Sequence, residues 1–125
     1  MFAEKTVRFY GNVLKTRPLS FPGMVARRVR EALSTPPHGL AITHFGDVAL
    51  PVDMDVHVLA RKYYFRTHEM FLETIFRRHL APGSIFVDIG ANMGYWSAFA
   101  ASLVGAVGEV HAFEPVPGIY ASLER

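Results

Sequence analysis

The stretch VDIGANMGYW, residues 87 to 96, constrains the fold of this chain more than any other. The apolar run SIFVDIG leads into it and is typical of a strand buried on both faces of a sheet. Gly90 permits a tight turn, and Asn92 is expected to cap a helix that ends near Gly105. EVHAFE then predicts a second strand, and PVPGIYASLER a further helix with proline in its first turn. This order is the opening of a doubly wound α/β sheet, here incomplete.

Two carboxylates flank the glycine turn. Asp88 lies at the tip of the first predicted strand, and Glu114 ends the second, 20 residues past Gly94. In open α/β sheets, ligands bind beyond the carboxyl ends of the strands, where glycines let a ligand approach the backbone. The mouth of the predicted site therefore contains Gly90, Ala91, Asn92 and Gly94.

The spacing of the glycines argues against a phosphorylated ligand. Dinucleotide sites use G-x-G-x-x-G and triphosphate loops end in Gly-Lys-Ser or Gly-Lys-Thr, whereas here Gly90 and Gly94 are separated by three residues. A carboxylate at Asp88 would repel a diphosphate and attract a cation, and an acid at Glu114 suits a ribose diol. These features together describe S-adenosylmethionine. An NAD-type oxidoreductase is the least favoured alternative, because Asp88 lies where phosphate would approach.

The segment FVDIGANMGYWSAFAASLVGAVGEVHAFEPVPGIYASLER resembles the start of the catalytic domain of the FkbM family of S-adenosylmethionine-dependent methyltransferases. It carries the D-x-G-A-N-x-G turn and the F-E-P after the second strand, and LAPGSIFVDIGAN is similar to the approach to that turn. The resemblance covers roughly the last third of the chain. It implies methyl transfer, usually to a hydroxyl of a small molecule or glycan, and it implies cofactor contacts at Asp88, Gly90, Asn92, Gly94 and Glu114. It identifies no catalytic residue.

Residues 1 to 82 are expected to form an accessory segment, and residues 83 to 125 the N-terminal part of a Rossmann-like domain that binds S-adenosylmethionine. In the accessory segment, apolar spacing and turn residues predict a β-hairpin around Gly46 and Asp47. Its second arm extends to Val58, with Pro51 suggesting an edge strand. Helices are predicted over residues 4 to 16, 23 to 33 and 67 to 80, the last with Phe71, Ile75 and Phe76 inward and Glu69, Glu73, Arg77 and Arg78 outward.

Charge is distributed unevenly along the chain. Residues 1 to 82 carry 12 Lys and Arg against 7 Asp and Glu, and residues 83 to 125 carry 1 against 4. We therefore expect the basic and acidic parts to have different roles. Arg27, Arg28 and Arg30 form a dense basic cluster, which is interpreted as a solvated helix face rather than a nucleic-acid site, because few aromatic residues interleave with it.

Other side chains are interpreted structurally. The absence of cysteine excludes disulfides and thiolate metal sites. Asp53, Asp55 and His57 share one strand face, but oxygen ligands for a hard cation normally converge from several segments, so no metal site is expected. His68 and His79 are three helical turns apart, too far to share an ion directly. Trp96 is expected in the core rather than stacked on an adenine.

The predicted sheet has only two strands, and a parallel sheet needs neighbours and helices on both sides. We therefore expect either an N-terminal fragment of a longer protein or a partner chain that completes the sheet. A non-catalytic remnant or interaction module that pairs through the open sheet edge is the alternative function. No signal peptide or membrane span is expected, which favours a cytoplasmic location.

Overall fold

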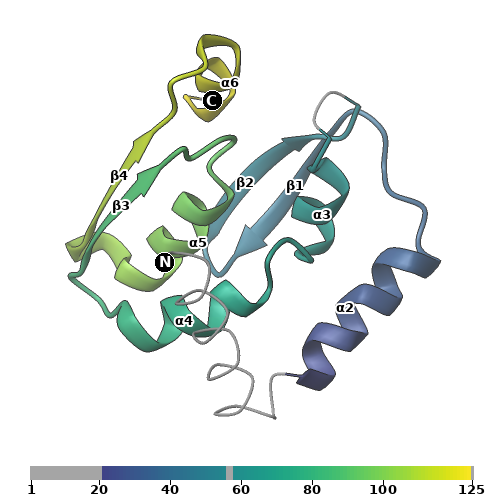
Figure 1. The fold of residues 1–125 in the computed structure, drawn as a ribbon, viewed down its shortest axis with the longest axis horizontal. Coiled ribbons are helices and arrows are strands. Elements are labelled where there is room, and N and C mark those ends of the chain that lie inside the picture. The colour runs from purple at the N-terminus through teal and green to yellow at the C-terminus, as the bar shows by residue number, and fades with distance from the viewer. Residues whose placement is uncertain (1–20, 56–57, 125) are drawn as a thin grey trace, which may run out of the picture.

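The computed structural model describes residues 21–55 and 58–124 (Figure 1). It has a mixed α/β fold, as the sequence predicts, and the predicted helix over residues 4 to 16 lies outside the described residues. In chain order the elements are α2 (Phe21–Leu33), β1 (Leu40–Phe45), β2 (Val48–Asp53), α3 (Ala60–Phe65), α4 (Phe71–His79), β3 (Ile85–Ile89), α5 (Tyr95–Val104), the short 3-10 helix η2 (Gly105–Val107), β4 (Glu109–Phe113) and α6 (Pro117–Leu123).

Strands β1 and β2 form the predicted antiparallel hairpin, with Leu40 opposite Asp53 and Phe45 opposite Val48. The second arm is shorter than predicted, because it ends at Asp53 rather than at Val58. The Asp53 carboxylate accepts a hydrogen bond from the backbone N–H of Asp55 at 3.1 Å, which turns the chain away from the ladder. One further backbone bond, from the N–H of Met54 to the carbonyl oxygen of Gly39 at 2.9 Å, lies beyond the last strand pair, and the side-chain bond then accompanies the turn.

Strands β3 and β4 pair in parallel, with Ile85 opposite Glu109 and Ile89 opposite Phe113, and α5 connects them. The prediction that the first of these strands is buried on both faces is wrong for the part of the chain that the structure describes. Ile85, Val87 and Ile89 are 65%, 52% and 85% exposed. Helix α5 covers only the opposite face, so an apolar β-branched run here has one buried side and one open side.

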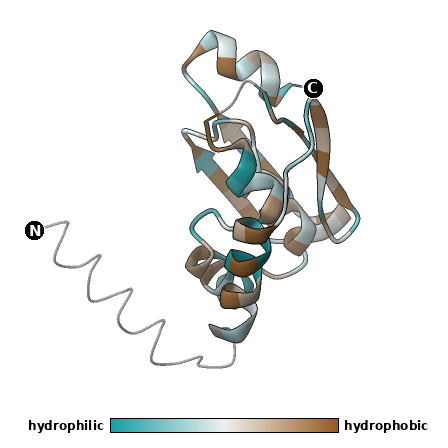
Figure 2. Cartoon of the chain, turned by 90° about the vertical axis from the view of Figure 1, so that its right-hand side faces the viewer, coloured by the Kyte–Doolittle hydropathy of each residue, from teal (hydrophilic) through white to brown (hydrophobic). Residues whose placement is uncertain are grey.

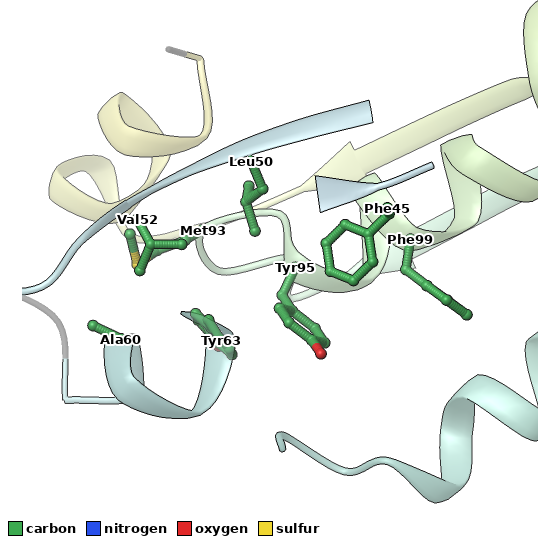
Figure 3. Close-up of a cluster of buried hydrophobic side chains, with 8 residues drawn as sticks. All are labelled: Phe45, Leu50, Val52, Ala60, Tyr63, Met93, Tyr95 and Phe99. Carbon is green, nitrogen blue, oxygen red and sulfur yellow. The ribbon is translucent and has the colours of Figure 1, made fainter. Parts of the chain in front are cut away.

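Helix α5 lies between the hairpin and the parallel pair (Figure 1) and contacts both. Its Tyr95 and Phe99 belong to a buried cluster with hairpin residues, including Phe45 (Figure 3). The rings of Tyr95 and Tyr63 stack at 4.8 Å. Trp96, expected in the core, is half-buried and packs against this cluster, with its ring centroid 5.1 Å from that of Phe76. The division at residue 82 stays a prediction, because the segments on either side of it share this core.

The region between the hairpin and β3 contains a helix that the sequence did not predict. Helix α3 ends at Phe65. The next residue, Arg66, adopts a left-handed conformation (φ 56°), and its backbone N–H donates to the carbonyl oxygen of Tyr63 at 3.1 Å. The next helix begins at Phe71 rather than at residue 67, because Glu69 also has positive φ. Two residues with left-handed backbone conformations thus lie between α3 and α4, and the helix predicted over residues 67 to 80 corresponds to α4 alone.

The predicted outward orientation of Glu73 is wrong. Its side chain is buried, with 7% of the residue exposed, and it pairs with the guanidinium groups of Arg27 and Arg66. Arg27 is therefore not part of a purely solvated helix face, as the sequence suggested. A charged pair that joins α2 to α4 is favourable here because each buried carboxylate oxygen has a donor.

No helix within residues 21–55 and 58–124 has the length and apolar character needed to cross a bilayer. Figure 2 shows polar and apolar residues interspersed along the helices and strands. Apolar side chains instead meet in the cluster around α5.

Candidate cofactor site

The predicted glycine turn connects β3 to α5 and is fixed mainly by its backbone. Gly90, Asn92 and Gly94 all have positive φ, at 81°, 54° and 82°. The N–H groups of Gly90 and Ala91 both donate to the carbonyl oxygen of Phe113, at 2.8 and 3.0 Å. These bonds tie the turn to the end of β4, so it lies at the carboxyl ends of both parallel strands.

The two glycines of the turn are required for different reasons. A Cβ at Gly90 would meet nothing within 4 Å, so the demand there is conformational and the space beside it is open. A Cβ at Gly94 would lie 2.8 Å from Cδ1 of Leu123 in α6, so this glycine also allows close packing. Gly90 is the position at which a ligand could approach the main chain.

Asn92 does not cap the helix as predicted. The residue that precedes α5 is Gly94, and no side chain caps the helix. Asn92 instead accepts a hydrogen bond through Oδ1 from the N–H of Met93 at 2.8 Å. Its short polar side chain tolerates the left-handed backbone conformation, so Asn92 acts as a turn residue.

The carboxylate of Glu114 joins the glycine turn to the loop after β4. Oε2 accepts from the N–H of Asn92 and Oε1 from the N–H of Val116, both at 2.9 Å. A carboxylate oxygen has two lone pairs, so each oxygen retains the capacity to accept a further hydrogen bond. Glu114 is thereby held in one orientation before any ligand arrives.

The side chain of Asp88 contacts α5. Its Oδ2 accepts a hydrogen bond of 2.6 Å from Oγ of Ser97, a buried residue in the first turn of α5. Ser97 is not among the site residues predicted from the sequence. The signal that could have found it is a lone hydroxyl in the first turn of a helix that packs on the strand carrying Asp88.

An open cleft of about 690 Å³ lies at the carboxyl ends of β3 and β4. Of the six predicted site residues, Gly90 and Glu114 line this cleft; Asp88, Ala91, Asn92 and Gly94 do not. The cleft is lined by Ile89, Gly90, Ala112, Phe113, Glu114, Pro115 and Tyr120. It therefore offers apolar surface around a single carboxylate.

Tyr120 also lines the cleft, and it is not among the site residues predicted from the sequence. Its hydroxyl donates a hydrogen bond of 2.6 Å to Oε1 of Glu124, one helical turn further along α6. That bond, followed by the charge of Glu124, raises the pKa of Tyr120 above its ordinary value. The phenol thus remains a neutral donor at the rim of the cleft.

The electrostatic setting of the cleft is acidic. Residues 83 to 124 contain no Lys or Arg, while they contain Asp88, Glu109, Glu114 and Glu124. A cationic ligand gains from this field and an anionic one loses. Among the described residues, no group of three or more His, Asp or Glu could hold a metal ion; His57 lies outside that part of the chain.

The chain is similar over part of its length to two proteins that are named as methyltransferases. Over 70 residues, 54% of its length, the chain is 40% identical to the 31-O-demethyl-FK506 methyltransferase FkbM of Streptomyces tacrolimicus. Over 59 residues, 46% of its length, it is 41% identical to a protein of Schizosaccharomyces pombe that its name assigns provisionally to the ribosomal RNA methyltransferases.

These matches span 26% and 20% of the two relatives, so the chain covers about a quarter or less of their length. No family model matches the chain. No solved structure matches it either. The sequence is nevertheless related over about half of its length to methyltransferases, and it is FkbM-like in that part.

Proposed function

We propose that this chain supplies the S-adenosylmethionine-binding part of an FkbM-type methyltransferase that methylates a hydroxyl of a small molecule or glycan. The observation that carries the proposal is the placement of Gly90 and Glu114 in one open cleft, at the ends of two adjacent parallel strands. The similarity to named methyltransferases supports it. A cytoplasmic location would fit this activity.

In this proposal the cleft holds the nucleoside. Glu114, already oriented by two backbone N–H groups, accepts hydrogen bonds from the ribose diol through its remaining lone pairs. Phe113 and Tyr120 provide surface for the adenine. Gly90 leaves room for the ligand to approach the main chain, and Asp88, braced by Ser97, contributes to the negative field that favours a cationic ligand.

S-adenosylmethionine supplies a methyl group activated by a positively charged sulfur. The residues of this chain contribute binding and orientation, because the turn and Glu114 are fixed by backbone hydrogen bonds. A preorganised acidic site also discriminates against phosphorylated nucleosides, whose charge it repels. No residue of this chain is assigned to binding the methyl acceptor or to removing its proton.

The test is calorimetric titration of the chain with S-adenosylmethionine, with NAD⁺ as the competing nucleotide. Glu114→Gln should weaken binding about tenfold or more, because one acceptor to the ribose and the negative charge are lost. Glu109→Gln is the matched control, since Glu109 lies at the opposite end of β4 and is exposed. Equal affinity of the two variants, or tighter binding of NAD⁺, would remove the assignment.

A second candidate is an interaction module in which the β3–β4 sheet pairs with a strand of a partner chain. The exposed Ile85, Val87 and Ile89 favour it, as does the pairing of β3 and β4 only with each other among the described strands. Size-exclusion chromatography with light scattering over a wide concentration range separates the candidates. A stable monomer that binds S-adenosylmethionine contradicts the second one.

A further inference from the structure

A second pocket lies between α2, β1 and the turn after α3, and it has the opposite chemistry to the cleft. Its volume is about 310 Å³, and its lining includes Arg27, Arg30, Thr43, His44 and Arg66. None of its lining residues lines the cleft at the ends of β3 and β4. Figure 1 shows α2 on the far side of the hairpin from β4.

The pocket carries more positive than negative charge. The guanidinium groups of Arg27, Arg30 and Arg66 line it. The one carboxylate that pairs with any of them is that of Glu73, which bridges Arg27 and Arg66 but does not line the pocket. Within residues 21–55 and 58–124, Arg30 has no ion-pair partner. Two positive charges therefore remain uncompensated, the formal charge that a phosphoryl dianion balances.

The nearby Glu31 does not neutralise this surplus, because it is engaged elsewhere. Its carboxylate pairs with Arg28 at 3.4 Å and lies 4.0 Å from Arg61. Neither of these arginines lines the pocket. The surplus charge thus stays at the pocket rather than being spread over the helix.

The guanidinium groups are held in place without exhausting their donors. Arg30 lies over the ring of Phe65 at 5.5 Å, and Arg66 lies over Phe45 at 4.7 Å. The bonds from Arg66 to Glu73 and to the carbonyl oxygen of His44 are long, at 3.3 to 3.4 Å. A guanidinium has five N–H donors, so all three arginines retain donors for a further oxyanion. Because their side chains are already packed on neighbouring rings, less conformational entropy is lost when an oxyanion binds.

We propose that this pocket binds a small oxyanion, best a phosphoryl group, through Arg27, Arg30 and Arg66. A planar guanidinium recognises phosphate through paired N–H···O bonds, which a lysine cannot reproduce. The phosphoryl group could be free or carried by a larger molecule. The inference goes beyond methyl transfer and does not rest on it, since neither the cleft nor Glu114 takes part.

The experiment titrates the whole chain with inorganic phosphate at constant ionic strength set with chloride, followed by calorimetry and thermal denaturation. We expect saturable binding and a rise of the unfolding midpoint. Arg30→Gln should weaken binding about tenfold, and Arg30→Lys should weaken it less. Arg28→Gln is the matched control, because Arg28 lies on the same helix outside the pocket, and it should change affinity less than about twofold.

Two further ligands distinguish the source of the oxyanion. A sugar phosphate that binds at least as tightly as phosphate, with the same loss in Arg30→Gln, supports a phosphorylated small molecule. A short oligoribonucleotide that binds far more tightly, and that Arg28→Gln and Arg30→Gln weaken equally, would overturn the proposal in favour of a diffuse basic face. Absence of phosphate binding above that of chloride would also overturn it, whatever the result with S-adenosylmethionine.

Discussion

The two ends of the molecule build their candidate sites by different means. Around the glycine turn, the main chain sets the geometry: three residues with positive φ and two N–H groups bonded to Phe113 form the site, and residues 83 to 124 carry no positive side chain. In the region from α2 to α4, side chains set the geometry, since Arg27 reaches Glu73 across 46 positions of sequence. This difference explains why a short sequence motif predicts the cofactor site, whereas no motif predicts the arginine pocket.

These two regions are not independent in packing. Helix α5 starts at the glycine turn and places Tyr95 and Phe99 among side chains of the hairpin and α3 (Figure 3). The Asp88 carboxylate contributes to raising the pKa of Tyr63, and the Glu73 carboxylate contributes to raising that of Tyr95. The variants below change the shared core, each site and the charges of the sites in turn. They test whether the two regions unfold and bind ligands independently.

The largest effect is expected for Phe99→Ala, which removes a fully buried ring between the hairpin and the parallel pair. Loss of burial and the cavity left behind should reduce the free energy of unfolding by about 3–5 kcal/mol. Urea unfolding followed by both circular dichroism and Trp96 fluorescence measures it. Two separate transitions in the wild-type chain would show that the regions fold independently and would contradict the shared core.

Glu73→Ala should have the next largest effect and should act through the basic region. It leaves the guanidinium groups of Arg27 and Arg66 without their carboxylate. We expect a loss of about 2–3 kcal/mol, below the cost for a fully buried pair because both arginines are partly exposed. Urea unfolding at neutral pH is the measurement. Glu109→Ala, an exposed control in β4, should change stability by less than about 0.5 kcal/mol, and an equal loss in both variants would contradict the structure.

Gly108→Ala and Gly90→Ala separate steric from conformational requirements near the parallel strands. A Cβ at Gly108, which has φ −102°, would lie 2.5 Å from Cβ of Val104 and 2.7 Å from the carbonyl oxygen of Ser84. Overpacking should cost about 1–3 kcal/mol. Gly90→Ala meets no atom and should cost about 1–2 kcal/mol from its positive φ alone.

Thermal denaturation of both glycine variants, with and without S-adenosylmethionine, distinguishes the two requirements. Stabilisation by the cofactor should disappear in Gly90→Ala and persist in Gly108→Ala, because only Gly90 lines the cleft. The reverse pattern would exclude the proposed role of the turn.

Alkaline pH should lower the free energy of unfolding, because two tyrosines of the shared core are buried. Burial, followed by the Glu69 and Asp88 carboxylates, raises the pKa of Tyr63 to about 12, and burial also raises the pKa of Tyr95. The neutral phenols therefore stabilise the folded chain fully below pH 10, and this stability is lost as pH rises from 10 toward 12. Urea unfolding across this range should show a decrease of about 1–2 kcal/mol, reduced in Tyr63→Phe. Constant stability would contradict the burial of these rings.

The smallest effect is expected for Ser97→Ala. It removes the hydroxyl that donates to Asp88, whose half-buried carboxylate can then be solvated. The expected loss of stability is about 1 kcal/mol. Ser102→Ala is a matched control on the same helix, because its hydroxyl only returns to the carbonyl oxygen of Phe99. Because Ser97 orients Asp88, the affinity for S-adenosylmethionine should fall in Ser97→Ala and stay unchanged in Ser102→Ala.

The sequence predicted the elements whose signals are local. The hairpin at Gly46 and Asp47, the helix that ends at Leu33, and the strand, helix, strand and helix after residue 84 are all present. Turn residues, apolar period and the position of proline each depend on neighbours within a few residues, so they are readable without the tertiary structure. The D-x-G-A-N-x-G motif and its glycine geometry belong to this class.

Tertiary structure alone decided which side chains are buried and how charges pair. The strand at Val87 is open on one face and Glu73 faces inward, because burial depends on which elements pack together. The same holds for Ser97 against Asp88, for Tyr120 at the cleft and for the arginine pocket. A pairing between distant residues requires the fold to bring them together, whereas a turn needs only its own few backbone angles.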